Sequence, residues 1–401
     1  MSFTTLSQDA KTPASENLKL TYRDTTLYKL GFNYTTGLDP DTTRQRNGQT
    51  LPSASYDNHL PLDTEGLVIY GAWYFVSDEY GPNVYVVSRL TGEILSVIQP
   101  PAAITPEING EANFTALVNP DTGRTANQGF EGLTLDEETG TLWALLQTAT
   151  VQDGGADKTT STHTRLLGWQ LDLTSLAGLT QPKLKYEYVV TLPQSKKGKT
   201  RGSSELHFIQ DGTFLVLARD GNGFGDTDSD SSYKNAALIS TDGATNIAGT
   251  KYDSPQNPVS PGGKLVAGIK DIQTQDFVSF VDKDQLAKFG LHTGGAIDQT
   301  LIASKLESLA LVPVTKSNDQ DYFLITVSDN DFITTQGKQA GQINGTGPYV
   351  LQSYQDPYAV QYGSQDTQVF VYRLSIKKGN NSKRFAQKRV IPTSTMLHFM
   401  P

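Results

Sequence analysis

Four glutamates of this chain each stand immediately before a run of apolar residues, in four stretches that share one pattern. Each stretch reads as a glutamate, an apolar strand, a turn and a second apolar strand that ends on polar residues. The four are Glu65, Glu131, Glu205 and Glu307. Recurring carboxylates can bind a cation or move a proton, so the elements that position them decide which chemistry is open to them.

The stretches predict β-strands in antiparallel pairs. Turn signals such as "LTGE" (90–93), "EETGT" (137–141) and "QDGT" (210–213) separate short apolar runs, as they do between strands joined by tight turns. A strand-rich unit that recurs along a chain is typical of a β-propeller. We therefore predict an all-β propeller of five or six blades, each a four-stranded antiparallel sheet, with an incomplete set if one blade is missing. The segment "KDQLAKFGL" (283–291) is the best candidate for a short helix.

The composition divides the chain into three segments. Residues 1–18 are polar and aperiodic and predict a flexible arm, residues 19–376 hold the predicted propeller, and residues 377–401 form a basic tail that we expect to be disordered. Six residues make the tail basic: Lys377, Lys378, Lys383, Arg384, Lys388 and Arg389. Such a tail can contact nucleic acid, but a polar terminus without periodicity favours a solvated tail.

The propeller geometry suggests a reason for the glutamates. The first strand of each blade lines the central channel, so equivalent residues from successive blades should converge. Carboxylates about 5 Å apart repel each other by roughly 3 kcal/mol at an effective dielectric constant near 20. Protonation, Arg or Lys partners, or a hard cation such as Ca²⁺ with its oxygen ligands would relieve that repulsion. The alternative is that these glutamates only accept hydrogen bonds from backbone amides where a strand begins.

Further acidic residues stand where the second strands end. Together with the glutamates they make the predicted metal ligands, which are Glu65, Asp78, Glu79, Glu131, Glu205, Asp220, Glu307, Asp329 and Asp331. The predicted catalytic residues are Glu131, Glu205, Arg219 and Lys305. Arg219 beside Asp220, and Lys305 beside Glu307, could bind a phosphate or form ordinary ion pairs.

The loop "DGNGFGDTDSDSS" (220–232) is not an EF-hand. Phe224 occupies the fifth position of the loop, and Ser231 stands where the bidentate glutamate is required. Asp226, Asp228 and Asp230 are consistent either with a surface calcium loop or with a solvated acidic loop.

Several classes of function are excluded or disfavoured by composition. The chain has no Cys and hence no disulfide or thiolate chemistry, and its net charge of −9 disfavours nucleic acid and anionic membranes as partners. No apolar segment is long enough for a spanning helix. No GxSxG, Walker or HExxH motif occurs, and no two of the five His have metal-site spacing, so metal-assisted hydrolysis is the phosphatase chemistry that remains.

The glutamate-led stretches also resemble a known family. Residues 65–95, 131–147, 201–223 and 304–337 are similar to the phytase-like family, catalogued as "esterase-like activity of phytase", a set of secreted microbial β-propeller proteins. The similarity extends over roughly residues 20–376. It implies a propeller with acidic, calcium-binding central sites and a phosphoric-ester hydrolase activity.

The chain also departs from that family. The resemblance implies a signal peptide and a first blade ahead of Thr21, a different ending after "QVFVYRLSI" (368–376), and Trp where Leu306 stands. We therefore expect an N-terminally truncated member. Our leading hypothesis is a monomeric, extracellular, calcium-assisted hydrolase of small phosphate esters. The alternative is a non-catalytic propeller with a structural central cation that binds a carbohydrate or a protein.

Overall fold

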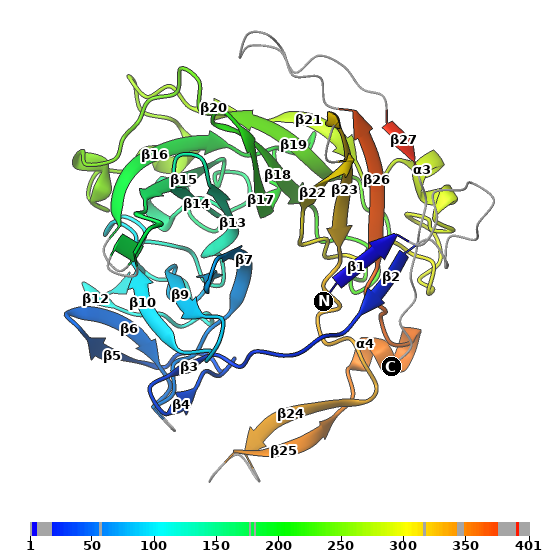
Figure 1. The fold of residues 1–401 in the computed structure, drawn as a ribbon, viewed down its shortest axis with the longest axis horizontal. Coiled ribbons are helices and arrows are strands. Elements are labelled where there is room, and N and C mark those ends of the chain that lie inside the picture. Colours follow the sequence, from blue (N-terminus) through cyan, green and yellow to red (C-terminus); the bar gives the residue numbers. More distant parts are fainter. Residues whose placement is uncertain are drawn as a thin grey trace. The chain divides into compact units, whose positions relative to one another are not determined.

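A computed structural model describes residues 2–5, 18–55, 58–175, 178–179, 182–315, 318–342, 349–375 and 390–392. These residues form β-strands with few and short helices (Figure 1). The chain divides into two compact units. The larger unit comprises Asp24–Ala218 and Ala236–Phe277, and the smaller unit comprises Met1–Arg23, Arg219–Asn235 and Val278–Pro401.

The larger unit contains three successive antiparallel sheets of four or five strands, each in sequence order apart from one added strand. The first holds β7 (Thr64–Tyr70), β8 (Trp73–Asp78), β9 (Val84–Ser88) and β10 (Ile94–Ile98). The second holds β13 (Phe130–Asp136), β14 (Thr141–Leu146), β15 (His163–Gln170) and β16 (Lys183–Thr191), with β20 (Ile272–Gln273) parallel to β16. The third holds β17 (Gly202–Gln210), β18 (Thr213–Arg219), β19 (Lys234–Ser240) and β21 (Gln275–Ser279).

Short elements surround these sheets. They are β3 (Lys29–Leu30), β4 (Asn33–Tyr34), β5 (Thr42–Arg46), β6 (Gln49–Ser53), β11 (Glu107–Ile108) and β12 (Glu111–Ala112), with the 3-10 helices η1 (Val151–Asp153), η2 (Lys251–Asp253) and η3 (Pro261–Gly263).

Apolar side chains fill the space between successive sheets. Phe75 and Val86 of the first sheet share one buried cluster with Phe130 and Leu167 of the second. A second cluster joins the second sheet to the third, and Trp143 stacks there on Tyr186 with the ring centroids 5.3 Å apart. The first strands β7, β13 and β17 lie side by side, as the blades of a propeller require (Figure 1).

The smaller unit holds a fourth sheet of the same kind. Its order is β22 (Ala310–Thr315), β23 (Asn318–Val327), β26 (Val369–Ser375) and β27 (Val390–Pro392). The hairpin of β24 (Gly337–Gln342) and β25 (Tyr349–Tyr354) interrupts it in sequence, and the unit also contains α3 (Lys283–Lys288), α4 (Pro357–Tyr362) and the paired strands β1 (Ser2–Thr5) and β2 (Leu18–Thr21). The short helix expected within 283–291 is confirmed as α3, which Asp282 caps by accepting a hydrogen bond from the Gln285 N–H.

The all-β propeller fold is thus confirmed. The described residues contain four sheets of blade order, fewer than the five or six predicted. Of the predicted arm, Ser2–Thr5 pairs with the strand that begins at Leu18, and of the predicted tail, Val390–Pro392 pairs with β26; the rest of both segments lies outside the described residues. No helix among the described residues is long and apolar enough to cross a membrane.

Candidate metal centre

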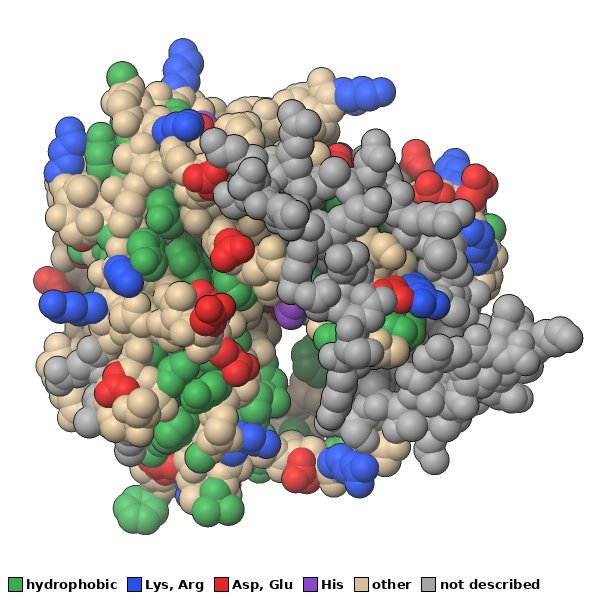
Figure 2. Space-filling model, turned by 45° about the horizontal axis from the view of Figure 1, so that its top comes forward, with side chains coloured by type: hydrophobic (Ala, Val, Ile, Leu, Met, Phe, Trp, Pro, Cys, Tyr) green, Lys and Arg blue, Asp and Glu red, His purple; other side chains and the backbone are tan. Residues whose placement is uncertain are grey.

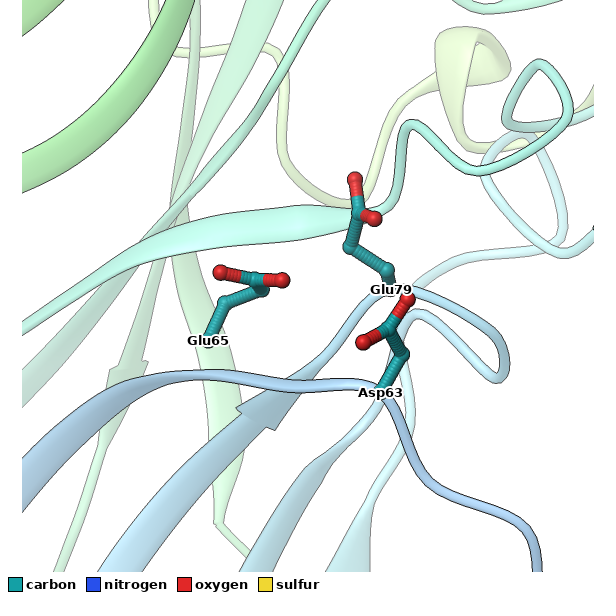
Figure 3. A group of neighbouring side chains, drawn as sticks. All are labelled: Asp63, Glu65 and Glu79. Atoms are coloured by element: carbon teal, nitrogen blue, oxygen red, sulfur yellow. The ribbon is translucent and has the colours of Figure 1, made fainter. Parts of the chain in front are cut away.

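Three carboxylates gather in the larger unit around the start of β7 and the end of β8. Asp63, Glu65 and Glu79 each contribute an oxygen atom, and these atoms all lie within 4.8 Å of one another (Figure 3). Within the part of the chain that the structure describes, this is the one group of three or more acidic, His or Cys residues with metal-site geometry. The Glu79 side chain is buried, at 2% exposed, and the other two are half-buried.

Backbone hydrogen bonds fix the arrangement of this centre. The Glu79 N–H donates to the Asp63 carbonyl oxygen at 2.9 Å. The Asp78 carboxylate accepts from the Asp63 N–H and from the Gly81 N–H, both at 2.8 Å. Asp78 is fully buried, and burial raises its pKa to about 7. Its two oxygens therefore hold the turn after β8 and the residue before β7, and Asp78, a predicted metal ligand, positions the centre without joining it.

Two β-bulges set the direction of the inner glutamates. The register between β7 and β8 shifts between Thr64 and Leu67, and the register between β13 and β14 shifts between Phe130 and Gly132. Glu65 and Glu131 lie at these shifts. A bulge bends the strand and re-aims a side chain, and bulges are common beside functional sites.

Glycines that follow these glutamates allow the inner strands to approach closely. A Cβ on Gly66 would lie 2.6 Å from the Leu133 Cβ and 2.9 Å from the Glu131 carbonyl oxygen. A Cβ on Gly132 would lie 2.5 Å from the Leu206 backbone nitrogen. The Glu-Gly pair at 65–66 and 131–132 therefore combines a bulge with tight packing against the next blade.

Electrostatic repulsion acts on Glu79. Burial raises its pKa well above the usual value, and the carboxylates of Glu131, Glu65 and Asp63 raise it further. The Glu79 Oε1 atom is buried and has no hydrogen-bond partner. A buried carboxylate in this position is stabilised by a proton or by a cation. The surrounding ligands are all carboxylate oxygens, the type that Ca²⁺ prefers.

Glu131 and Glu205 continue the acidic series on the next two inner strands. Gln147 donates a hydrogen bond from Nε2 to the Glu131 Oε1 atom. Glu205 accepts hydrogen bonds at Oε1 from the Leu206 N–H at 2.7 Å and from the Leu133 N–H at 3.4 Å. Burial raises the pKa of Glu205 to about 8, and Glu131 adds to the shift. Electrostatic coupling thus extends from Glu79 through Glu131 to Glu205.

Sequence comparison identifies the family. The family model described as "Phytase-like: Esterase-like activity of phytase" matches residues 9–332. The chain belongs to the phytase-like family. A relative from Arthroderma benhamiae, named "Uncharacterized secreted protein", is 36% identical over 373 residues, covering 81% of this chain and 71% of the relative.

Comparison with solved structures returns β-propellers at low similarity. The β-propeller domain of Cps50 (Swd1) from Myceliophteria thermophila is 9% identical, with 88% of this chain and 74% of that chain covered and a TM-score of 0.26. Hsv2 from Kluyveromyces lactis is 9% identical, with 78% and 76% covered and a TM-score of 0.24. TM-scores of this size are too low to show a shared fold, so the assignment of this phytase-like chain as a propeller rests on its own sheet order.

The remaining predicted residues of this phytase-like protein lie in the smaller unit, and each has a partner there. Arg219 forms an ion pair with Glu307. The Lys305 Nζ atom lies 2.9 Å from Asp331 Oδ1 and 3.9 Å from Asp329 Oδ2. These carboxylates are therefore neutralised by the protein itself.

Asp220 is likewise engaged within the smaller unit. Its buried carboxylate accepts hydrogen bonds from the Ser231 hydroxyl at 2.7 Å and from the Ser232 N–H at 2.8 Å, and it lies 3.4 Å from the Lys234 Nζ atom. In the loop after it, the Asp228 N–H donates to Asp226 and the Asp230 N–H donates to Asp228. These three loop aspartates do not form a three-carboxylate group among the described residues.

The structure thus brings Glu65 and Glu79 of the predicted ligands together, and adds Asp63. Asp63 stands two residues before Glu65, whereas Gly129, Ser203 and Lys305 stand two residues before the other glutamates. A search for repeated acidic positions could not find Asp63, because this residue does not recur.

Lysine and arginine side chains do not form a broad patch on the face drawn in Figure 2, where the described ones stand isolated among polar and apolar residues. The expectation that nucleic acid is not a partner stays a prediction.

Proposed function

We propose that this phytase-like chain binds Ca²⁺ through Asp63, Glu65 and Glu79 and uses that centre to hydrolyse phosphoric esters. The observation that carries the proposal is the buried Glu79 carboxylate among like charges, with one oxygen lacking a hydrogen-bond partner. Three convergent carboxylates and no softer ligand fit a hard divalent cation. When bound, such a cation supplies positive charge that offsets the charge of a phosphate group.

The protein residues would then share the remaining work. Asp63, Glu65 and Glu79 hold the cation, and the backbone bonds to Asp78 keep them in place. Glu131, oriented by Gln147, accepts a proton from the water that attacks phosphorus. The phosphorus–oxygen bond to the alcohol breaks, the leaving oxygen takes up the proton that Glu131 received from water, and the products are the alcohol and inorganic phosphate. Glu205 is the second acid–base candidate, because burial holds its pKa at about 8.

The role of Arg219 and Lys305 in binding a phosphate group stays a prediction, and both residues belong to the smaller unit, whereas the carboxylate centre belongs to the larger unit. Each would have to weaken its present ion pair, with Glu307 and Asp331 respectively, to do so. Their role therefore depends on whether phosphate competes with a carboxylate of the same unit.

We also propose that the protein works outside the cell as a monomer. The Arthroderma benhamiae relative is named a secreted protein, which supports this location. Extracellular calcium sites commonly have dissociation constants of about 10⁻⁴–10⁻³ M, a range that a site of only three carboxylates can match.

The test is turnover of p-nitrophenyl phosphate and of phytate in calcium and in EGTA. We expect calcium-dependent turnover that falls at least about tenfold in Glu79→Gln and in Glu131→Gln, a loss of about 1.4 kcal/mol or more in transition-state stabilisation. Asp321→Asn is the matched control, since Asp321 belongs to an ion pair with Arg373 and neither residue has a role in the proposed reaction. Turnover that is unaffected by EGTA and by both substitutions would contradict the proposal.

A structural cation is the second candidate function. It is favoured by the hydrogen bond from the Glu79 N–H to the Asp63 carbonyl oxygen. This hydrogen bond places the ligands where the start of β7 lies beside the end of β8 in the first sheet. A cation bound there would stabilise the pairing of β7 with β8 in the first sheet. A rise in melting temperature with calcium, without turnover of any phosphate ester, would identify this role.

A further inference from the structure

Glu205 and His207 lie on one face of the inner strand β17. Leu206 and Phe208, which alternate with them, both pack into the apolar cluster between the second and third sheets. Because side chains alternate along a strand, Glu205 and His207 leave β17 on the other side, and the Glu205 carboxylate turns back to accept a hydrogen bond from the Leu133 N–H of β13. Both are half-buried. Two polar side chains therefore stand two residues apart on β17, which lies beside β13, the strand that carries Glu131.

Each of the two side chains has at least one atom that is available to form a further hydrogen bond. The His207 ring makes no hydrogen bond or ion pair with any residue that the structure describes. Glu205 receives both of its hydrogen bonds at Oε1, from the Leu206 and Leu133 amides, which leaves Oε2 for another partner. A neutral imidazole offers one donor and one acceptor.

The chemistry of the pair disfavours two kinds of ligand. An anion at this place would lie beside the acidic side chains of Glu131 and Glu205, so a phosphate group does not fit here. A metal ion would find too few ligands, because Glu131, Glu205 and His207 do not form a three-residue group among the described residues. A hydroxyl group can donate to one partner and accept from the other, and an imidazole and a carboxyl group two residues apart suit neighbouring hydroxyls.

We propose that Glu205 and His207 form a subsite for a neutral, hydroxylated ligand, a sugar or another polyol, on the side of β17 that Leu206 and Phe208 do not occupy. The subsite itself does not depend on the proposed hydrolase activity. Its further role does rest on that activity: a hydroxylated alcohol part of a phosphate ester would bind at Glu205 and His207, with the phosphate directed toward the calcium centre.

Nuclear magnetic resonance of the histidine rings tests this inference on the full chain with calcium. The chain has five His, and the resonances of His207 are assigned by their loss in His207→Gln. The probes are glucose, glucose 6-phosphate and inorganic phosphate, each added to tens of millimolar. We expect glucose and glucose 6-phosphate to shift the His207 resonances, whereas inorganic phosphate does not. His292, which faces Asp298 in the smaller unit, is the internal control and should not move.

Substitutions separate a binding role from a packing role. Glu205→Gln keeps a donor and an acceptor and should bind glucose within about threefold of the unsubstituted chain, whereas Glu205→Leu and His207→Ala should weaken binding at least tenfold, about 1.4 kcal/mol. Calcium affinity and melting temperature, measured on the same samples, show that each variant is folded.

Three results would overturn the subsite. They are a His207 shift with inorganic phosphate alone, a His207 shift with Zn²⁺ but not with glucose, and no shift with either sugar probe. The proposed function fails separately. If glucose shifts His207 but no ester is hydrolysed, the subsite stands without the hydrolase. If glucose 6-phosphate is hydrolysed with a KM that His207→Ala leaves unchanged, the hydrolase stands without the subsite.

Discussion

The glutamate that stands at the start of each repeated stretch has different surroundings in the two units. In the smaller unit, Glu307 pairs with Arg219, and Asp331 pairs with Lys305. In the larger unit, Glu205 is held by backbone amides, and Glu79 is buried beside other carboxylates with one oxygen atom lacking a hydrogen-bond partner. The glutamate that starts a blade is therefore not functional by itself. What surrounds it decides whether the protein neutralises its charge or leaves that charge for a proton or a cation.

Buried and half-exposed ion pairs should respond very differently when one partner is removed. In the larger unit Arg165 is fully buried, 2.8 Å from Asp153 and 2.7 Å from Glu187. Arg165→Met leaves two buried carboxylates without their cation, so the free energy of unfolding should fall by about 3–5 kcal/mol. Urea denaturation measures this change.

Arg373→Met in the smaller unit is the matched control. Arg373 pairs with Asp321 but its side chain is 41% exposed, so the loss should stay below about 1 kcal/mol. Equal losses of unfolding free energy in Arg165→Met and Arg373→Met would contradict the expected difference between the buried and the half-exposed ion pair.

Calcium should stabilise the larger unit through its carboxylate centre. At a free calcium concentration of about 100 times the dissociation constant, the gain in free energy of unfolding is about 2.7 kcal/mol. Thermal denaturation with calcium and with EGTA measures it. The gain should disappear in Glu79→Gln and persist in Glu307→Gln, and a gain that survives in both variants would place the ion elsewhere.

Removing one charge should have opposite signs in the two units when calcium is absent. Arg219→Met leaves Glu307 without its partner and should lower the free energy of unfolding by about 2 kcal/mol, because both side chains are mostly buried. Glu79→Gln removes a carboxylate from a like-charged cluster and should raise it. Denaturation in EGTA measures both, and a loss of stability in Glu79→Gln would refute the repulsion.

The pH dependence of stability should differ between the units. A raised pKa means that the folded state holds the Glu205 proton more tightly than the unfolded state, so this stabilisation is complete below pH 4.5 and is lost as the pH rises to about 8. The loss is at most about 1.4 kcal/mol per pH unit. Denaturation in EGTA between pH 5 and pH 8 should show a shallower slope for Glu205→Gln than for the unsubstituted chain. Asp321→Asn should keep the original slope, because Arg373 lowers the pKa of Asp321 and this carboxyl group titrates below that pH range; identical slopes in all three would contradict the raised pKa of Glu205.

Much of the fold follows from the repeated stretches, because alternating strands and turns are local signals. Glu65 and Glu131 fall within β7 and β13 as predicted. Glu307, by contrast, lies before β22 begins at Ala310, and the β24–β25 hairpin interrupts the fourth sheet without a signal in the repeat.

The candidate site was less accessible to sequence reasoning. Glu65 and Glu79 were predicted as ligands, but Asp63 has no counterpart in the other stretches, and Asp78 carries the acidic signal of a ligand while its oxygens bind backbone amides. A sequence shows that a residue is acidic but not which groups its oxygens face, since that depends on bulges and on the neighbouring blade. His207 was missed for the same reason, because a lone His within a strand pattern gives no sign that its ring lacks a partner.

Calorimetric titration of the metal-free chain with Ca²⁺ tests the central claim most directly. We predict saturable binding that Glu79→Gln weakens at least tenfold and that Glu307→Gln leaves unchanged. Calcium binding of equal affinity in the unsubstituted chain and in Glu79→Gln, or no saturable binding in the unsubstituted chain, would contradict a metal centre at Asp63, Glu65 and Glu79.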